Sequence, residues 1–167
     1  MLRKDNMDGK LRNMTSVYLF DADGVLGLFR VGSKVANEMY VGSAGGHFEK
    51  DELSDARACA MRELREELGL TELPDIKLRY VTCRLKNGEL RNNYYFFAPF
   101  DRSIPLTSNE GTLRWFSWEE AKSIKMPVSA RHMMDHYLTV GRFDEKLYGA
   151  MTEPGGSRFV ELKEFDD

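Results

Sequence analysis

Three glutamates stand close together near the middle of the chain, at Glu63, Glu66 and Glu67. Their spacing of three and four residues places all three side chains on one face of a helix, within about one turn. Carboxylate oxygens are the ligands that hard divalent cations such as Mg²⁺ prefer, usually together with substrate phosphates and water. A solvated acidic helix face has the same spacing, so the glutamates alone do not establish a metal site.

A glycine pair, Gly45 and Gly46, precedes these glutamates. Because glycine has no Cβ, the backbone there can approach a ligand closely, and a glycine carbonyl would add an oxygen ligand. The helix that must present the glutamates is predicted from Ser54 to Leu68, a stretch without Pro or Gly. Ser54 is the expected N-cap of this helix, and Gly69 is its expected left-handed C-terminal cap.

The stretch from the glycine pair to Leu70 resembles the signature of the Nudix hydrolases. That signature is a Gly, five residues, a Glu, seven residues, and then Arg-Glu-apolar-any-Glu-Glu-any-Gly-apolar. Gly46 and Glu52 match its first part, and Arg62 to Leu70 match its second part at every fixed position. The gap differs, because nine residues separate Glu52 from Arg62 where the family has seven.

The resemblance implies a fold of the α/β class, an α/β/α sandwich with a mixed β-sheet. We expect one such domain over residues 1–167, with about the first 12 residues and the C-terminal tail peripheral to it. The length and the 42% apolar content suit a single globular domain with a sizeable core.

The order of elements follows from hydrophobic alternation, helical periodicity and turn residues. Asn87 and Gly88 form a strong hairpin signal between two long strands, and a closing hairpin is expected through Pro154, Gly155 and Gly156. Strands are predicted at Met14–Phe20, Val25–Arg30, Met39–Ser43, Ile76–Leu85, Leu90–Phe100 and Leu113–Trp118, and further helices at Glu119–Lys125 and Val128–Val140.

The resemblance also implies an activity, which is the metal-dependent hydrolysis of a nucleoside diphosphate linked to another group. Mg²⁺ is the expected cofactor, with Mn²⁺ as a substitute. The metal ligands implied are the carbonyl of Gly46 and the carboxylates of Glu63, Glu66 and Glu67. By resemblance Glu66 or Glu67 is the general base, and Glu110, in the loop before the sixth predicted strand, is the other candidate.

Three further site residues are implied in the same way. Glu52 and Arg62 are expected to pair with each other and fix the loop on the helix, although the longer gap puts that pairing in question. Arg30 ends the second predicted strand, where the family often has a basic residue that meets substrate phosphate. Arg30 and Glu110 are explained equally well as charges in solvent.

The sequence indicates the substrate less clearly than it indicates the fold or the site residues. The size and flanking strands resemble bacterial MutT-like members, so the expected reaction converts a nucleoside triphosphate, including oxidised forms such as 8-oxo-dGTP, to the monophosphate and pyrophosphate. ADP-ribose, nucleotide sugars and dinucleoside polyphosphates are alternatives, as is a nucleotide-sensing module without catalysis. An isomerase of this fold would need a catalytic Cys, and neither Cys59 nor Cys83 is well placed.

The composition narrows the expected partners and location. A net charge of −3 argues against a polymeric nucleic-acid ligand held on a broad basic surface, so the expected ligand is a small nucleotide. No apolar segment approaches the roughly 20 residues that span a bilayer, and no signal peptide is evident. We therefore expect a cytoplasmic protein that does not bind membranes. Family members include homodimers, which keeps a homodimer open.

Overall fold

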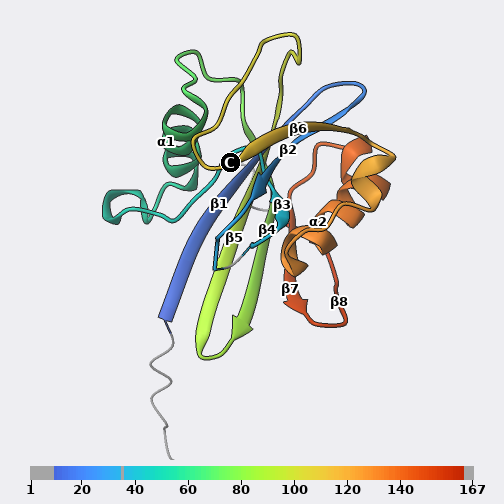
Figure 1. The fold of residues 1–167 in the computed structure, drawn as a ribbon. Coiled ribbons are helices and arrows are strands. Elements are labelled where there is room, and N and C mark those ends of the chain that lie inside the picture. The colour runs from blue at the N-terminus through green and yellow to red at the C-terminus, as the bar shows by residue number, and fades with distance from the viewer. Residues whose placement is uncertain (1–9, 35, 164–167) are drawn as a thin grey trace, which may run out of the picture.

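The computed structural model describes residues 10–34 and 36–163. A mixed β-sheet lies between two α-helices, which confirms the α/β/α sandwich (Figure 1). The strands are β1 (Lys10–Phe20), β2 (Gly24–Arg30), β3 (Met39–Val41), β4 (Lys77–Lys86), β5 (Glu89–Pro99), β6 (Thr112–Ser117), β7 (Tyr148–Glu153), β8 (Gly156–Ser157) and β9 (Val160–Glu161). The helices are α1 (Ala56–Leu68) and α2 (Val128–Thr139), and 3₁₀ turns lie at η1 (Lys50–Glu52), η2 (Glu120–Lys122) and η3 (Gly141–Phe143).

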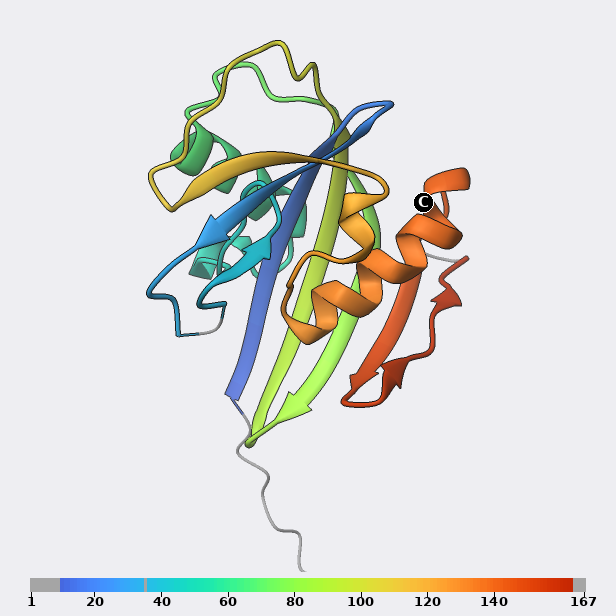
Figure 2. The same cartoon turned by 45° about the vertical axis from the view of Figure 1, so that its right-hand side comes forward.

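The sheet is mixed because two of its pairings are parallel, β1 with β5 and β4 with β7. The strand order is β3-β2-β1-β5-β4-β7-β8, with β6 on β2 and β9 on β7. Strands β1, β5 and β4 are the longest, and their lower ends in the view extend past both helices (Figure 2).

The two helices cover opposite faces of the sheet, and each face has its own core (Figure 1). The α1 side is mostly aliphatic, with Val17, Leu19, Leu26, Ala60, Leu64 and Leu68 among its buried residues. The α2 side is rich in aromatic rings, with Tyr18, Tyr80, Tyr95, Phe97, Phe116 and Tyr137 among its buried residues. Alternation along β1 and β5 sends successive side chains to one core and then to the other.

The predicted hairpin between β4 and β5 is confirmed. Asn87 and Gly88 both have positive φ, at 51° and 72°, as the two central residues of the favoured tight hairpin turn require. The turn sets the register in which Lys86 pairs with Glu89, and Arg84 with Arg91.

Several boundaries differ from the sequence prediction for physical reasons. Strand β1 begins at Lys10 rather than Met14, because it pairs with β5 along its entire length. The N-cap of α1 is Asp55 rather than Ser54, since the Asp55 carboxylate accepts a hydrogen bond from the Ala58 N–H at 2.9 Å. The helix predicted at Glu119–Lys125 is only the 3₁₀ turn η2.

The C-terminal region enters the sheet instead of lying at its periphery, since β7 pairs with β4 and then turns back into β8 as the predicted closing hairpin. The buried side chain of Arg79 ties this region down, because its guanidinium donates to the carbonyls of Gly141, Asp144 and Lys146 at 2.7–3.0 Å. Lys10, Leu11 and Arg12 belong to β1, while the rest of the segment expected to be peripheral, residues 1–9, lies outside the described residues.

No helix formed by the described residues is long and apolar enough to cross a membrane. The cytoplasmic location stays a prediction.

Candidate active site

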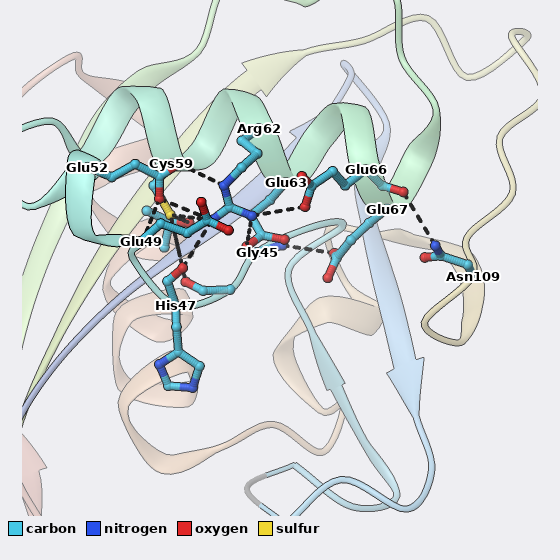
Figure 3. A network of polar contacts seen from close by, with 12 residues as sticks. Gly45, His47, Glu49, Glu52, Cys59, Arg62, Glu63, Glu66, Glu67 and Asn109 are labelled. Carbon is cyan, nitrogen blue, oxygen red and sulfur yellow. Dashed lines mark hydrogen bonds and ion pairs between the residues drawn. The ribbon is translucent and has the colours of Figure 1, made fainter.

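Helix α1 is held by its C-terminal cap and by its buried apolar face, and this determines the direction in which its glutamates point. Gly69 ends the helix as predicted, with a φ of 65° and its N–H bonded to the Arg65 carbonyl at 3.0 Å. Leu64 and Leu68 are buried against the sheet, so the neighbouring helix face that carries the glutamates is turned toward the Gly45–Gly46 loop (Figure 3).

Arg62 organises the first part of the site (Figure 3). Its guanidinium donates to both carboxylate oxygens of Glu52, at 2.7 and 3.1 Å, and to the His47 carbonyl at 3.1 Å. The predicted pairing of Glu52 with Arg62 is therefore present despite the longer gap, and it joins the loop to the helix. The hydrogen bonds from Arg62 hold the pKa of the buried Glu52 carboxyl down at about 2.

Arg62 also holds two of the predicted metal ligands. Its Nη1 lies 2.9 Å from Glu63 Oε1 and 2.9 Å from Glu66 Oε2. Burial raises the pKa of Glu63, with Arg62 acting in the opposite direction. The Glu66 side chain is 59% exposed, so it is open to a ligand in solvent.

The third glutamate faces the glycine pair. Glu67 Oε2 accepts a hydrogen bond from the Gly45 N–H at 3.0 Å, and burial raises the pKa of Glu67 to about 7. A Cβ on Gly46 would overlap the carboxylate of Glu63 as it lies here, so the absence of a side chain at Gly46 lets this carboxylate approach the loop closely. The carbonyl of Gly46 accepts a hydrogen bond from the Thr15 N–H at 2.9 Å, and its role as a metal ligand stays a prediction.

Arg30 and Glu110 come together although 80 residues separate them. Arg30 Nη2 lies 2.6 Å from Glu110 Oε2, which links the end of β2 to the loop before β6. Both groups act electrostatically on the carboxyl of Glu67, in opposite directions. The structure therefore brings these two predicted residues to the glutamate cluster, where they neutralise each other.

The donor set suits a hard divalent cation. Glu63 and Glu67 are carboxylates whose pKa values burial has raised, so a cation between them and Glu66 would replace solvation that they have lost. Within residues 10–34 and 36–163, however, no group of three His, Cys, Asp or Glu side chains is already arranged to hold a metal ion. Glu63 and Glu66 are turned toward Arg62, so metal binding requires these carboxylates to rotate away from the guanidinium.

Sequence reasoning missed the backbone partners of the site. The Gly45 N–H and the His47 carbonyl fix Glu67 and Arg62, and Asn109 Nδ2 donates to the Glu66 carbonyl at 3.4 Å (Figure 3). The sequence offered one indication of these backbone contacts, because Gly45 and His47 lie on either side of Gly46, which was predicted to be in the site. Cys59 is buried, and burial raises the pKa of its thiol to about 11, so it remains protonated at neutral pH.

Comparison with known proteins decides the family. Residues 10–137 match the model of the NUDIX domain. The chain belongs to the Nudix family. As a Nudix hydrolase it is a pyrophosphohydrolase of substrates that contain a linked nucleoside diphosphate. The search of curated proteins found no match to this Nudix chain.

Solved structures share the fold of this Nudix domain. They include a MutT protein from Bacillus halodurans, with a TM-score of 0.65, 20% identity, and coverage of 92% of this chain and 99% of that one. A MutT protein from Methanosarcina mazei gives a TM-score of 0.64 at 15% identity, covering 83% and 99%. The NUDIX domain of Shewanella oneidensis NrtR, solved with ADP ribose, gives 0.60 at 10% identity, covering 81% and 89%.

Proposed function

We propose that this Nudix domain hydrolyses nucleoside triphosphates, including oxidised ones, to the monophosphate and pyrophosphate with Mg²⁺ as cofactor. One observation carries the proposal, namely that Glu63, Glu66 and Glu67 face the Gly45–Gly46 loop with two of their carboxyl pKa values raised by burial. When bound there, Mg²⁺ would neutralise charge on the diphosphate and lower the pKa of the attacking water.

The side chains take distinct parts in this proposal. Glu66 or Glu67 accepts a proton from the water that attacks phosphorus, and the bond from that phosphorus to the bridging oxygen breaks, releasing pyrophosphate. Glu67 suits the task because its carboxylate lies against the Gly45 N–H at the glycine loop, and burial raises its pKa to about 7 in the absence of a cation. Glu110 is the alternative base. Arg30, which pairs with Glu110 here, would break that ion pair and bind a substrate phosphate instead.

Arg62 has a positioning role. Its two bonds to Glu52 and its bond to the His47 carbonyl hold the loop against α1, and its contacts with Glu63 and Glu66 offset the repulsion between those carboxylates. Glu63 and Glu66 would hold the cation through the carboxylate oxygens that now contact Arg62, and the pair with Glu52 would keep Arg62 in place.

The test is metal-dependent release of pyrophosphate or phosphate across normal and oxidised nucleoside triphosphates, ADP-ribose, nucleotide sugars and dinucleoside polyphosphates. We expect Glu66→Gln and Glu67→Gln to lower kcat by about 10²–10⁴-fold, the usual contribution of a general base, while both variants stay folded. Glu72→Gln, a change at an exposed glutamate after α1, is the matched control and should retain full activity.

Chelation completes the experiment. EDTA should stop turnover, and Mg²⁺ or Mn²⁺ should restore it. Wild-type rates in both glutamate variants, or activity that is indifferent to EDTA, would remove this cluster from the mechanism.

ADP-ribose is the second candidate substrate, and one observation favours it, because the structurally similar NrtR NUDIX domain was solved with ADP ribose. If this chain resembles NrtR in ligand choice, ADP-ribose will be the preferred compound of the panel. Nucleotide binding by thermal shift without cleavage of any compound would instead support a sensing module.

A further inference from the structure

The two helices cover different parts of the sheet. Helix α1 packs on β1, whereas α2, on the other side, packs on β4 and β7. Figure 2 shows α1 (green) at the left of the sheet and β7 (red) at its right. On the α1 side, the outer strands β7 and β9 therefore lie away from the helix, as do the ends of β1, β5 and β4 that extend past it.

Large apolar side chains are exposed on this part of the α1 side. Leu90 of β5 is the direct partner of Leu11 in β1 and of Leu85 in β4, so the three side chains form a row across three strands. Leu90 is six residues before Phe96, which is buried in the core beneath α1, and the even spacing puts both on the same face. The three leucines are nevertheless between 37% and 59% exposed.

The row continues onto the outer strands. Met151 of β7 is the partner of Cys83, which is two residues before Leu85 and shares its face. Val160 of β9 is the partner of Gly149, two residues before Met151, so Val160 also lies on this face. Met151 and Val160 are 57% and 48% exposed.

The opposite face of the outer strands is covered, since Thr152 is buried and Phe159 packs against the aromatic core on the α2 side. We call the exposed set on the α1 side the open face, and its members are Leu11, Leu85, Leu90, Met151 and Val160. The open face crosses five neighbouring strands, which span about 19 Å at about 4.8 Å between strands. Single exposed apolar residues are common on protein surfaces, but a contiguous patch of them marks a site of interaction.

A groove in the open face carries two opposite charges. Its volume is about 530 Å³, and its lining includes Met151, Val160, Leu162, Glu153 and Arg158. Glu153 and Arg158 are exposed, and neither forms an ion pair with any other described residue. The groove therefore has no excess of either sign, and a surface that complements it must carry one acid and one base. The same groove on a second copy of the chain meets that requirement.

We propose that the open face joins two copies of this chain about a twofold axis. Such an axis places the same patch of each subunit against the other, so Arg158 of one protomer contacts Glu153 of the partner subunit, and the reverse contact also forms. The five apolar side chains form the centre of the interface, and the two ion pairs lie at its rim. Stable dimers bury about 800 Å² per subunit around an apolar centre with a polar rim. None of these residues belongs to the candidate active site, so the inference does not depend on the proposed function.

The test is sedimentation equilibrium of the full-length protein at micromolar concentrations, which measures both the mass and the dissociation constant. We expect twice the mass of one chain. Val160→Lys places a charge in the apolar centre and should raise the dissociation constant about 10–100-fold. Val140→Lys is the matched control, because Val140 at the end of α2 is 41% exposed and lies outside the open face. That variant should keep the wild-type dissociation constant.

Exchange of the two charges tests whether the partner is a second copy. Arg158→Glu and Glu153→Arg each place like charges opposite each other across the axis, and each should raise the dissociation constant about 10-fold. The double variant Arg158→Glu/Glu153→Arg restores opposite charges and should recover the wild-type value. Both residues are exposed, so all three variants should keep the circular dichroism spectrum of the wild type.

Three results would contradict the inference. A wild-type protein that stays monomeric overturns it, including the case in which the open face binds a different protein. A dimer that Val160→Lys leaves intact, or that Val140→Lys weakens to the same extent, would show that the two copies meet elsewhere. If the double charge exchange fails to recover the dissociation constant, the pairing of Arg158 with Glu153 is wrong, and the assignment of a second copy as the partner fails with it.

Discussion

The two faces of the sheet are stabilised in different ways. On the α2 side, large rings fill the space between helix and strands, and Tyr137 stacks on Phe97 with 3.9 Å between ring centroids. On the α1 side the contacts are aliphatic and smaller, and the connection between helix and loop passes through the charged contacts of Arg62 with Glu52.

This difference separates the residues that mainly stabilise the fold from those that form the candidate active site. The aromatic face depends on buried area and shape, which change little with pH or salt. The α1 face holds its loop through ionised groups, whose contribution depends on pH. Ionised contacts occur on both sides of the sheet, since Arg79 pairs with Asp144 near the aromatic core, but the contacts of Arg62 are the ones that hold the candidate active site together.

The largest effect should come from the aromatic face. Tyr137→Ala removes a buried ring and should lower the free energy of unfolding by about 3–5 kcal/mol, as measured by urea denaturation. Tyr137→Phe keeps the ring and should lose less than about 1.5 kcal/mol. Because this side is remote from the glutamates, kcat per folded molecule should stay at the wild-type value in both variants. A loss of kcat in Tyr137→Phe would contradict the separation.

The charged face should respond to acid. The pKa of Glu52 is about 2 in the folded protein and about 4.5 when unfolded, so the unfolded state takes up the proton first as the pH falls. The stabilisation is therefore fully present above pH 4.5 and is lost progressively as the pH falls from 4.5 to about 2.

Glu52→Gln tests this contribution, and it should lower the free energy of unfolding at pH 7 by about 2 kcal/mol. The variant should also show a weaker loss of stability with acid over that range, whereas Tyr137→Phe should follow the wild-type pH profile. Parallel pH profiles for wild type and Glu52→Gln would show that the pair does not stabilise the protein.

The smallest effect concerns the start of α1. Asp55→Ala removes the capping carboxylate and should cost about 1 kcal/mol in the free energy of unfolding. Ser54→Ala, one residue earlier, should change it by less than about 0.5 kcal/mol. Reversal of the two effects would return the N-cap to Ser54, the position that the sequence alone favoured.

Local features of the fold were predictable from the sequence because their causes are local. Asn87 and Gly88 specify a turn that needs two positive φ values, and Gly69 specifies a left-handed cap. The N-cap was wrong by one residue, since Ser54 and Asp55 are both good capping residues and their order along the chain does not show which one faces the first turn.

The candidate site was predictable in residue type but not in contacts. The signature located Glu52, Arg62 and the glutamates, yet the ion pair of Arg30 with Glu110 joins segments 80 residues apart. The alignment of Arg12, Arg91 and Arg84 on three neighbouring strands was missed for a related reason. They meet through the parallel pairing of β1 with β5 and the antiparallel pairing of β5 with β4, and hydrophobic alternation does not determine which strands become neighbours or in what register.

The segment between Glu52 and the start of α1 has a consequence for how such chains diverge. Glu52 is anchored by the 3₁₀ turn η1 and by Arg62, and Asp55 is anchored by the helix, while Leu53 and Ser54 between them are exposed. Even a doubling of loop length costs only about 0.6 kcal/mol in closure entropy, so two added residues change the free energy of folding very little. Insertions can therefore accumulate at this point during evolution without moving the glutamates, and a motif search that fixes the gap at seven residues would overlook relatives whose three-dimensional site is intact.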